Sequence, residues 1–371
     1  MDYDKVMEFL GRFTTDFGAT GSAGAAAIGN RLGLYRLPRS AVPPIPPRRV
    51  RRPALAECRA TPQQFAERTG YKERYLTEWL RGQAAGGYVT YDAATGEFSL
   101  TPEQAFCLAD PNGPNVSAAF VAVLGYLRAE PQLAGAFRTG AGVGWHEHHE
   151  DVFVGCDAFY RPGYVANLVP SWIPALDGVD AKLTAGARVA DLGCGLGSSS
   201  VLLAEAYPNS TIVGSDYHTE SIDLARKKAA EAGVSARVSF EVATAQTFTG
   251  SNYDLVTTFD PLHDMGDPVG AARRVRESLA PDGTWLLVEP FAGDNVEENL
   301  NPVGRLYYAG SLFLCRDVVP LVPNGLSQAG GYALGGQAGE SAIRQVTAEA
   351  GFTRFRRAAQ TPFNLVYEVR P

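Results

Sequence analysis

The spacing of hydrophobic residues changes near residue 187. Beyond that point, short apolar runs alternate with amphipathic segments. The apolar runs predict strands at 188–193, 211–216, 238–242, 254–259 and 284–290, and the other segments predict helices from Ser198, at 219–232, at 267–279 and at 340–350. Strands this apolar, separated by helices, indicate a parallel sheet that is covered on both faces. We therefore expect a doubly wound α/β domain over 181–371.

The first hundred residues follow a different plan. Helical spacing covers 6–35, a helix begins with Thr61-Pro62 and ends at Gly70, and another covers 72–85. Two short strands, 88–91 and 97–100, follow on either side of a turn. Helix, turn, helix and a two-stranded wing predict a winged helix within 1–112. Residues 113–180 are expected to form a helical connector.

One segment fits neither domain. Residues 37–60 contain six prolines and six arginines and show no apolar periodicity. Neither a helix nor a strand is supported by such a composition, so we predict a disordered loop. A frame-shifted stretch of the coding sequence is the alternative, which resequencing of the locus would test.

Composition limits the class of protein. With 371 residues, 45% of them hydrophobic, the chain is long enough for two domains. Its first residues are acidic where a secretory signal is basic, and no apolar run approaches the roughly 18 residues that span a bilayer, so we expect a cytoplasmic protein without a membrane partner. Five scattered cysteines, without a CxxC pair, predict neither a zinc site nor disulfides. The net charge of -7 argues against nucleic acid as the main partner.

A glycine-rich turn joins the first strand of the α/β domain to the next helix. Residues 193–197 read Gly-Cys-Gly-Leu-Gly, which lets the backbone turn sharply beside a helix N-terminus whose amides favour anionic groups. Asp191 precedes the turn, and Asp216 ends the next predicted strand, 19 residues after Gly197. A carboxylate at that position can accept hydrogen bonds from both hydroxyls of a ribose. The pattern therefore predicts a nucleotide-type cofactor site.

These residues carry a family resemblance. The string V-A-D-L-G-C-G-L-G at 189–197, followed by Asp216, resembles motif I of class I S-adenosylmethionine (SAM)-dependent methyltransferases, and L-A-P-D-G at 279–283 resembles the turn before their fifth strand. The whole chain is similar to bacterial small-molecule methyltransferases with an N-terminal winged helix. The resemblance implies a Rossmann-like sheet, SAM as cofactor, a small and largely apolar methyl acceptor, and a homodimer formed through the N-terminal domain.

The resemblance also implies cofactor contacts at particular positions. The turn and the residue before it would frame the methionine end of SAM, the carboxylate after the second strand would hold the ribose, and the residues after the second, third and fourth strands would line the rest of the site. These residues are Asp191, Gly193, Cys194, Gly195, Gly197, Asp216, Tyr217, Thr244, Ala245 and Phe259. The family often has Asp near 244, so in this chain backbone amides or Gln246 would recognise the adenine.

The catalytic candidates follow the fourth predicted strand. His263 resembles the general base in the LHDW motif of small-molecule O-methyltransferases, although Met265 stands where that family has Trp. This is the edge where catalytic groups of such sheets lie, and a histidine titrates in the range that proton removal requires. Asp260 or Asp264 would orient its ring. A hydrogen-bonded structural role for His263 is the alternative.

An insertion between the last two predicted elements is expected to cover the methyl group. Residues 291–338 form this excursion, and together with the connector they predict a lid and acceptor pocket. The candidate contacts are Phe159, Tyr164, Asn301, Arg305, Tyr308 and Gln337. For each of them, packing in the core is the alternative.

Two further features of the sequence suggest other functions. Residues 146–151 read His-Glu-His-His-Glu-Asp, but nearby glycines and the lack of a second cluster favour a solvated polar turn and no metal. A winged helix also suggests a transcriptional regulator that senses SAM or a small ligand. Residues 1–110 hold 14 Lys and Arg against 12 Asp and Glu, and 8 against 11 without 37–60, which favours dimerisation over DNA binding. A SAM-binding protein without catalytic activity is a third alternative. The sequence does not distinguish O-methylation from N- or C-methylation.

Overall fold

The computed structural model describes residues 1–371 except 36–54, 57, 111–112, 141–142 and 315–333. Most of the segment predicted to be disordered, and much of the predicted lid, therefore lie outside the described residues. The described chain forms two compact units, Met1–Leu124 with Val154–Pro162, and Gly125–Phe153 with Gly163–Pro371. None of the helices in these described ranges has the length and hydrophobicity needed to span a bilayer.

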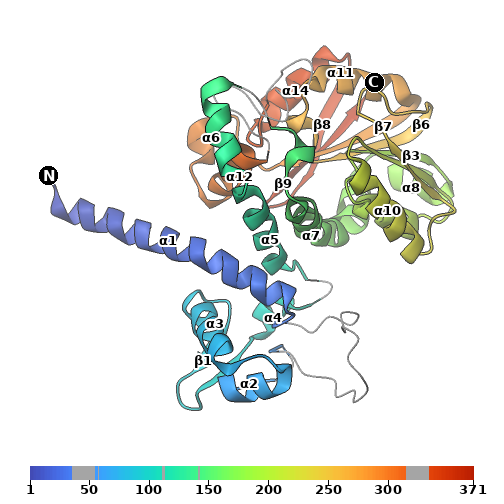
Figure 1. Ribbon diagram of the computed structural model, residues 1–371. Coiled ribbons are helices and arrows are strands. Elements are labelled where there is room, and N and C mark those ends of the chain that lie inside the picture. The colour runs from blue at the N-terminus through green and yellow to red at the C-terminus, as the bar shows by residue number, and fades with distance from the viewer. Residues whose placement is uncertain (36–54, 57, 111–112, 141–142, 315–333) are drawn as a thin grey trace. The chain divides into compact units, whose positions relative to one another are not determined.

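The first unit consists of helices and one small antiparallel hairpin (Figure 1). Its elements are α1 (Tyr3–Arg31), α2 (Pro62–Thr69), α3 (Glu73–Ala85), β1 (Thr90–Asp92), β2 (Glu97–Ser99) and α4 (Pro102–Leu108), while α5 (Val116–Leu127) and α7 (Glu150–Asn167) run across the boundary between the units. Thr61 caps α2 in a capping box with Gln64, and Gly70, with φ of 77°, ends it. The winged helix predicted from the sequence is confirmed.

The core of this unit includes the end of the segment predicted to be disordered. Phe65, Leu80 and Phe98 are buried together, and Leu55 and Ala60 belong to the same cluster. Ala60 also pairs with Phe98 as an isolated strand bridge. The expectation of disorder up to residue 60 is therefore wrong at its end, because apolar residues that reach a core and a strand edge become ordered whatever precedes them.

The second unit carries a mixed seven-stranded sheet in the order β5-β4-β3-β6-β7-β9-β8. Its strands are β3 (Arg188–Leu192), β4 (Thr211–Asp216), β5 (Val238–Val242), β6 (Tyr253–Phe259), β7 (Leu279–Pro290), β8 (Arg354–Gln360) and β9 (Asn364–Arg370). Strands β3 to β7 are parallel, which confirms the predicted doubly wound sheet. The order of the strands reverses at β3, so the carboxyl ends of β3, β4 and β6 meet at the place where such sheets bind ligands.

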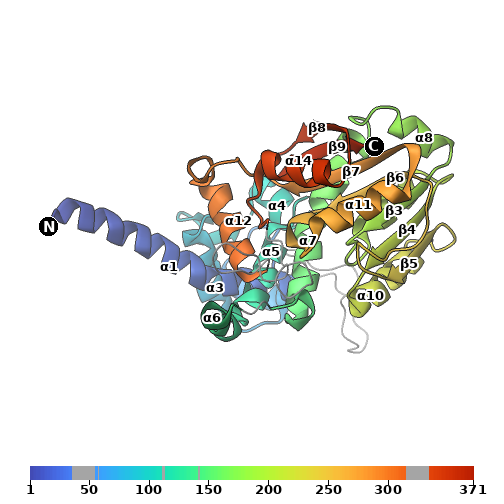
Figure 2. The ribbon, with the colours of Figure 1, turned by 90° about the horizontal axis from the view of Figure 1, so that it is seen from above.

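Helices cover both faces of this sheet (Figures 1 and 2). One core lies under η2 (Leu168–Trp172), α8 (Val179–Ala185), α9 (Ser198–Ala206) and α10 (Thr219–Glu231). The other lies under α11 (Pro268–Ser278) and α14 (Gly339–Glu349). The remaining elements of the unit are short or belong to the connector and the insertion, and they are α6 (Glu130–Thr139), η1 (Trp145–Glu147), η3 (Leu262–Asp264), η4 (Val296–Asn299) and α12 (Pro302–Phe313).

Two antiparallel strands at one side of the sheet are not among the predicted ones. β9 pairs with β7 and with β8, which forms the edge. Three arginines in β8 mask its strand pattern, and charged side chains are common on edge strands because they discourage pairing with another chain. The predicted turn at 279–283 is a bulge within β7, because Leu279 pairs with Tyr253 and Thr284 already pairs with Leu255.

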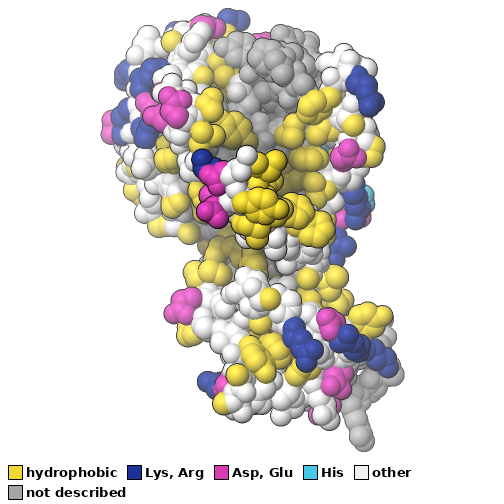
Figure 3. Space-filling model, turned by 90° about the vertical axis from the view of Figure 1, so that its left-hand side faces the viewer, with side chains coloured by type: hydrophobic (Ala, Val, Ile, Leu, Met, Phe, Trp, Pro, Cys, Tyr) yellow, Lys and Arg dark blue, Asp and Glu magenta, His cyan; other side chains and the backbone are white. Residues whose placement is uncertain are grey.

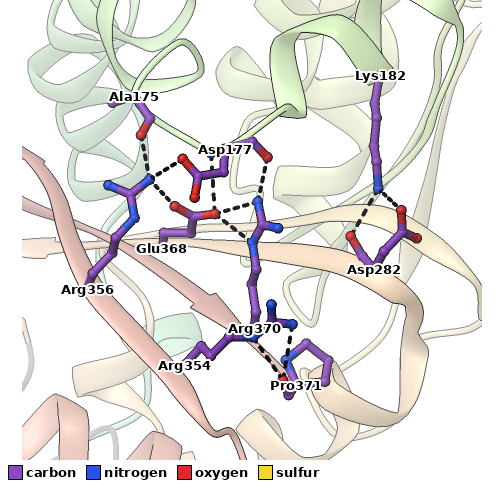
Figure 4. Close-up of polar contacts among 9 residues, drawn as sticks. All are labelled: Ala175, Asp177, Lys182, Asp282, Arg354, Arg356, Glu368, Arg370 and Pro371. Atoms are coloured by element: carbon purple, nitrogen blue, oxygen red, sulfur yellow. Dashed lines mark hydrogen bonds and ion pairs between the residues drawn. The ribbon is translucent and has the colours of Figure 1, made fainter.

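A buried carboxylate joins this antiparallel pair to the loop after η2 (Figure 4). Glu368 on β9 is 3% exposed and forms ion pairs with Arg356 of β8 and with Arg370. The Arg370 Nε donates to Glu368 Oε1 at 2.6 Å, and the backbone amide of Asp177 donates to the same oxygen at 3.3 Å. Arg356 also donates to the Ala175 carbonyl oxygen at 2.8 Å. The cluster therefore holds β8 and β9 against the 175–177 loop.

Candidate functional site

The glycine-rich turn after β3 is fastened to the end of β4. The backbone amides of Gly193 and Cys194 both donate to the Ser215 carbonyl oxygen, at 2.8 and 3.1 Å. The amide of Gly195 donates to Asp216 Oδ2 at 3.0 Å. The turn and the carboxylate that the sequence places in one site are therefore in direct contact.

The Asp216 carboxylate is fixed through both of its oxygens. Oδ2 accepts from Gly195, and Oδ1 accepts from the backbone amide of His218 at 2.9 Å. Burial raises the pKa of Asp216, and these amide hydrogen bonds oppose the shift by favouring the ionised form. The residue is half-buried. It is thus a rigid acceptor at the carboxyl end of β4.

The last glycine of the turn is required by its surroundings. Gly197 begins α9 with φ of 75°, a conformation that L side chains rarely adopt. A Cβ atom at this position would lie 2.8 Å from the Phe240 ring and 2.9 Å from Ala225 Cβ. Any side chain here would push the turn away from β5 and α10.

Asp191, which was predicted to contact the cofactor, makes its hydrogen bonds within the protein. It is fully buried, and its Oδ2 accepts hydrogen bonds from the hydroxyls of Ser199 and Ser200, each at 2.6 Å. Its Oδ1 accepts from the Thr257 hydroxyl at 2.8 Å. Burial raises the pKa of Asp191, and the three hydroxyls oppose that shift. The carboxylate therefore joins the first turn of α9 to β3 and β6, behind the glycine turn.

A turn from the connector covers Tyr217. The rings of Tyr217 and His146 lie 6.4 Å apart, edge to face. Burial and the charge of Asp216 raise the pKa of the Tyr217 phenol, and its hydrogen bonds with the backbone of Trp145 and His146 oppose the shift. Trp145 also packs on Phe153, at 5.2 Å between ring centroids. The sequence motifs do not predict Trp145 or His146 as site residues, because they lie 72 and 71 residues before Tyr217 in the chain.

The residues after β5 and β6 take different positions. Thr244 is exposed, and its backbone amide donates to the Thr247 hydroxyl oxygen at 3.1 Å. Ala245, the next residue, is half-buried. The Gln246 side-chain amide donates to the Asp267 carbonyl oxygen at 3.2 Å. Phe259 is buried at the end of β6. The Gln246 amide group that could replace a carboxylate at the adenine is therefore used to bind the start of α11.

His263 is held by a carboxylate from the neighbouring strand. Its Nδ1 lies 2.6 Å from Oε2 of Glu289, which is buried near the end of β7. The other oxygen of Glu289 accepts from the Leu262 amide at 3.0 Å. Glu289 is not among the residues that the motifs predict. The sequence did contain a signal for Glu289, because an acidic residue at the end of a buried strand lies at the same sheet edge as His263.

The two predicted aspartates lie near His263 in different ways. Asp264 Oδ1 lies 3.3 Å from His263 Nε2, so it faces the nitrogen opposite Glu289. Asp260 is buried, and its Oδ1 accepts from the side-chain amide of Asn364 at 3.1 Å. Burial and the adjacent Glu289 hold the pKa of Asp260 well above its usual range. The partner that orients Nδ1 is thus Glu289, where the sequence suggested Asp260 or Asp264.

The candidate acceptor contacts do not form one cluster. Tyr164 packs on Phe259, with ring centroids 5.0 Å apart, whereas Phe159 belongs to the other compact unit. On α12, Asn301 caps the helix by accepting from the Gly304 amide at 2.9 Å. Arg305 and Tyr308 are exposed, and Gln337 is half-buried. The Gln337 Oε1 is buried without a hydrogen-bond partner among the described residues.

The end of the insertion returns to His263. The Gly335 amide donates to the His263 carbonyl oxygen at 3.3 Å. A Cβ atom on Gly336 would lie 3.9 Å from His263 Nε2. Gly335 and Gly336, which precede Gln337, therefore lie beside the edge of the His263 ring that carries Nε2.

The predicted polar turn at 146–151 is only partly solvated. His149 caps α7, where its Nδ1 accepts from the Asp151 amide at 3.1 Å, and His148 is buried. Within the ranges that the structure describes, no group of three or more His, Cys, Asp and Glu side chains is arranged to hold a metal ion.

Comparisons with known proteins agree with this geometry. Residues 183–311 match a family model described as a methyltransferase domain, and residues 54–110 match one described as an Rv2258c-like winged HTH domain. The chain is 35% identical over 118 residues to trans-aconitate 2-methyltransferase of Streptomyces avermitilis, which is 31% of this chain and 43% of that protein. It is 32% identical over 105 residues to ubiquinone biosynthesis O-methyltransferase of Actinobacillus pleuropneumoniae, covering 26% and 43%. The matches thus span less than half the length of these relatives.

Solved structures share the fold over the whole chain. The mitomycin 7-O-methyltransferase structure has a TM-score of 0.67 at 18% identity and covers 100% of both chains. Human N-acetylserotonin methyltransferase, solved in complex with SAM, has a TM-score of 0.68 at 16% identity and covers 98% of this chain and 97% of its own. Likeness at this identity establishes the fold. This chain therefore joins an Rv2258c-like winged-helix domain to a methyltransferase domain of the class I fold.

Proposed function

We propose that this protein is a SAM-dependent methyltransferase that acts on a small molecule. The observation that carries the proposal is the contact between Gly195 and Asp216, because it brings the glycine turn and a fixed carboxylate to one sheet edge. Relatives and structural neighbours named as methyltransferases support it, and one neighbour was solved with SAM. The activity itself is what the experiments below test.

The described residues fit this cofactor. Asp216 has both oxygens held in place and is half-buried, so it would accept hydrogen bonds from the ribose hydroxyls. Gly193, Gly195 and the start of α9 would bound the methionine end, and Tyr217 would lie beside the adenine under the turn Trp145–Glu147. SAM would supply an activated methyl group on a sulfonium. Asp191 would act from behind the turn, by holding α9.

His263 would remove the proton from the acceptor. With Nδ1–H donated to Glu289, the neutral ring carries its lone pair on Nε2, the nitrogen that a general base uses. Glu289 and Asp264, on opposite sides of the ring, would stabilise the imidazolium that forms. This arrangement favours an acceptor that must lose a proton, such as a hydroxyl or an amine.

The acceptor would lie beside His263 and the returning insertion. Gly336 leaves room next to Nε2, and Gln337 Oε1 is a buried acceptor that a donor group of the substrate would satisfy. Tyr164 and Phe259 would supply an apolar wall. Arg305 and Tyr308, which are exposed on α12, and Asn301, which caps it, would contribute at the rim. Phe159 remains a sequence prediction.

Calorimetry and turnover of a His263→Ala variant test the proposal. Purified protein would be titrated with SAM and with its demethylated product, and then assayed with labelled SAM against a metabolite extract. We expect the variant to bind both cofactors normally and to lose turnover by a factor of about 10² to 10⁴, which is the usual contribution of a general base. His149→Ala is the matched control, because it also removes an imidazole, but one whose role in the structure is to cap α7.

Different outcomes remove different parts of the proposal. Unchanged turnover in His263→Ala would remove the base assignment and leave the methyltransferase. If folded wild-type protein takes up neither SAM nor its demethylated product, the cofactor assignment fails. Uptake without methylation of any extract component would favour a SAM-binding protein that lacks catalysis.

We also propose that α1 pairs with α1 of a second copy. Tyr3, Met7, Leu10, Phe13 and Phe17 recur every three or four residues and are all exposed, whereas the residues of this helix that pack in its own unit lie from Ala23 onward. Figure 3, which faces the N-terminal end of α1, shows hydrophobic side chains gathered there. Apolar stripes of this kind are usually covered by a partner.

Sedimentation of a Phe13→Glu, Phe17→Glu double variant tests this pairing. The two rings stack at 5.6 Å, so both charges would enter the same contact. We expect wild-type protein to sediment as a dimer and the variant as a monomer, while Thr15→Glu, which alters an exposed polar position on the opposite side of the helix, stays dimeric. A wild-type monomer at micromolar concentration would exclude the pairing.

The match to a winged HTH model keeps a regulator as the second candidate function. The slight acidic excess outside 37–60 argues against it, since phosphate binding needs a basic face. A salt-sensitive gel shift with genomic fragments would reverse this preference. The cytoplasmic location expected from the sequence stays a prediction.

A further inference from the structure

Asp260 occupies an unusual position beside the predicted base. Its backbone amide donates to the Val288 carbonyl oxygen at 2.8 Å, which continues the pairing of β6 with β7. Its φ is +63°, a left-handed conformation that few residues other than Gly, Asn and Asp adopt. The chain turns here, just after β6, and the side chain is buried.

The surroundings of Asp260 are strongly acidic. Glu289 on β7 and Asp264 on η3 both raise its pKa, while His263 lowers it. On α12, the phenol of Tyr307 is buried near the same carboxyl, and burial together with Asp260 raises the pKa of Tyr307. These groups and Asn364 come from four elements packed around one carboxyl. Three carboxyls, two of them buried and that of Asp264 half-buried, therefore share one cluster with an imidazole.

Asn364 is the residue bonded to this carboxyl. Its side-chain amide, at the start of β9, lies 3.1 Å from Oδ1 and 3.4 Å from Oδ2 of Asp260. A neutral amide is a weak compensation for a buried negative charge, compared with the two backbone amides that hold Asp216. Glu289, by contrast, has both the Leu262 amide and the His263 ring. Of the two adjacent carboxyls, Glu289 is therefore the one better supported as an anion.

We propose that Asp260 is a positioning residue that remains a neutral carboxylic acid in the folded protein, tied to Asn364, and thereby keeps His263 neutral and able to accept a proton. If Asp260 were also ionised, a third negative charge beside the imidazole would stabilise its protonated form. A protonated histidine cannot act as a base. The consequence for His263 rests on the proposed function, whereas the protonation state of Asp260 does not.

Thermal unfolding against pH tests the protonation state without any activity. An acid whose pKa is raised in the folded state keeps its proton above about pH 4, where the unfolded chain has lost it. Wild-type protein should therefore lose stability relative to Asp260→Asn as pH rises from about 4 towards neutral. Asn is nearly isosteric, is neutral, and tolerates positive φ, so this variant should fold.

The matched control has the opposite sign. Lys182 lowers the pKa of Asp282, so stability that depends on the ionised Asp282 is gained as pH rises and lost in acid. Wild-type protein should thus be more stable than Asp282→Asn near neutral pH and should lose this advantage in thermal stability only at low pH. If the midpoint difference between wild type and Asp260→Asn is flat from pH 4 to 8, Asp260 is not a retained acid and the proposal fails.

The pH profile of kcat/KM tests the effect on His263. With Asp260 already neutral, Asp260→Asn should leave the acid limb of the profile within about 0.3 pH units of wild type. A shift of the limb to lower pH by one unit, a factor of ten in the proton affinity of the base, would show that Asp260 was an anion beside the ring. Should the protein have no methyltransferase activity, the unfolding experiment still decides the protonation state, so the two failures are distinguishable.

Discussion

Replacing Glu368 by Gln tests whether the buried ion cluster behind β9 stabilises the second unit. Glu368 is 3% exposed and pairs with two arginines (Figure 4). Removing one partner of a buried ion pair costs about 3–5 kcal/mol, because the remaining charge loses its compensation. Here the Arg356 side chain is 44% exposed and can turn into water, so part of this cost is avoided. Arg370, 18% exposed, has less freedom.

We therefore expect Glu368→Gln to lower the free energy of unfolding by about 2–3 kcal/mol. In a unit of this size each kcal/mol lowers the melting temperature by roughly 2–4 °C, so the midpoint should fall by about 5–10 °C. The assay is thermal unfolding followed by near-ultraviolet circular dichroism. Asp223→Asn is the control, since the exposed Asp223 forms its ion pair with Arg226 in solvent and should give no measurable shift. Equal midpoints for the two variants would refute the reasoning.

Two further predictions concern the site. Glu289→Gln removes the carboxylate that accepts from His263 Nδ1, so we expect kcat to fall by about 10²-fold with unchanged cofactor affinity. The acid limb of the pH profile of the rate should also move to lower pH, because the imidazolium loses a stabilising negative charge. Initial-rate measurements and calorimetry check these effects, and an unchanged kcat contradicts them. Gly197→Ala should cost more stability than Gly233→Ala, because both glycines have positive φ, at 75° and 71°, but only Gly197 is crowded by Phe240. Denaturant titration compares the two, and equal losses would mean that the turn relaxes freely.

Local patterns were sufficient to predict the parallel part of the fold. The strands β3 to β6 are apolar runs whose ends match the predicted ones closely, and the contact between the glycine turn and Asp216 follows from the topology of such sheets. The capping box at Thr61 is equally local. In each case the deciding interactions lie within a few residues or between consecutive strands.

Contacts between distant segments were not predictable from the sequence. The sequence places His263 and Glu289 at one sheet edge, but their pairing depends on how far β7 extends beyond β6, and the Asp260 contact with Asn364 joins residues 104 apart. Strands β8 and β9 were missed because arginines and a buried Glu368 interrupt their apolar pattern, and only the tertiary ion pairs explain that residue. Asp191 carries the motif's expected residue type, yet three hydroxyls behind the turn occupy it.

The position of β9 has a consequence for biosynthesis. Residues 364–370 fill the gap between β7 and β8, so the sheet stays open until this segment has been synthesised and has left the ribosome. Until then β7 presents an unpaired, apolar border that another nascent chain could occupy, as incomplete sheets do during slow folding. Deleting residues 364–370 is therefore expected to cause aggregation during expression.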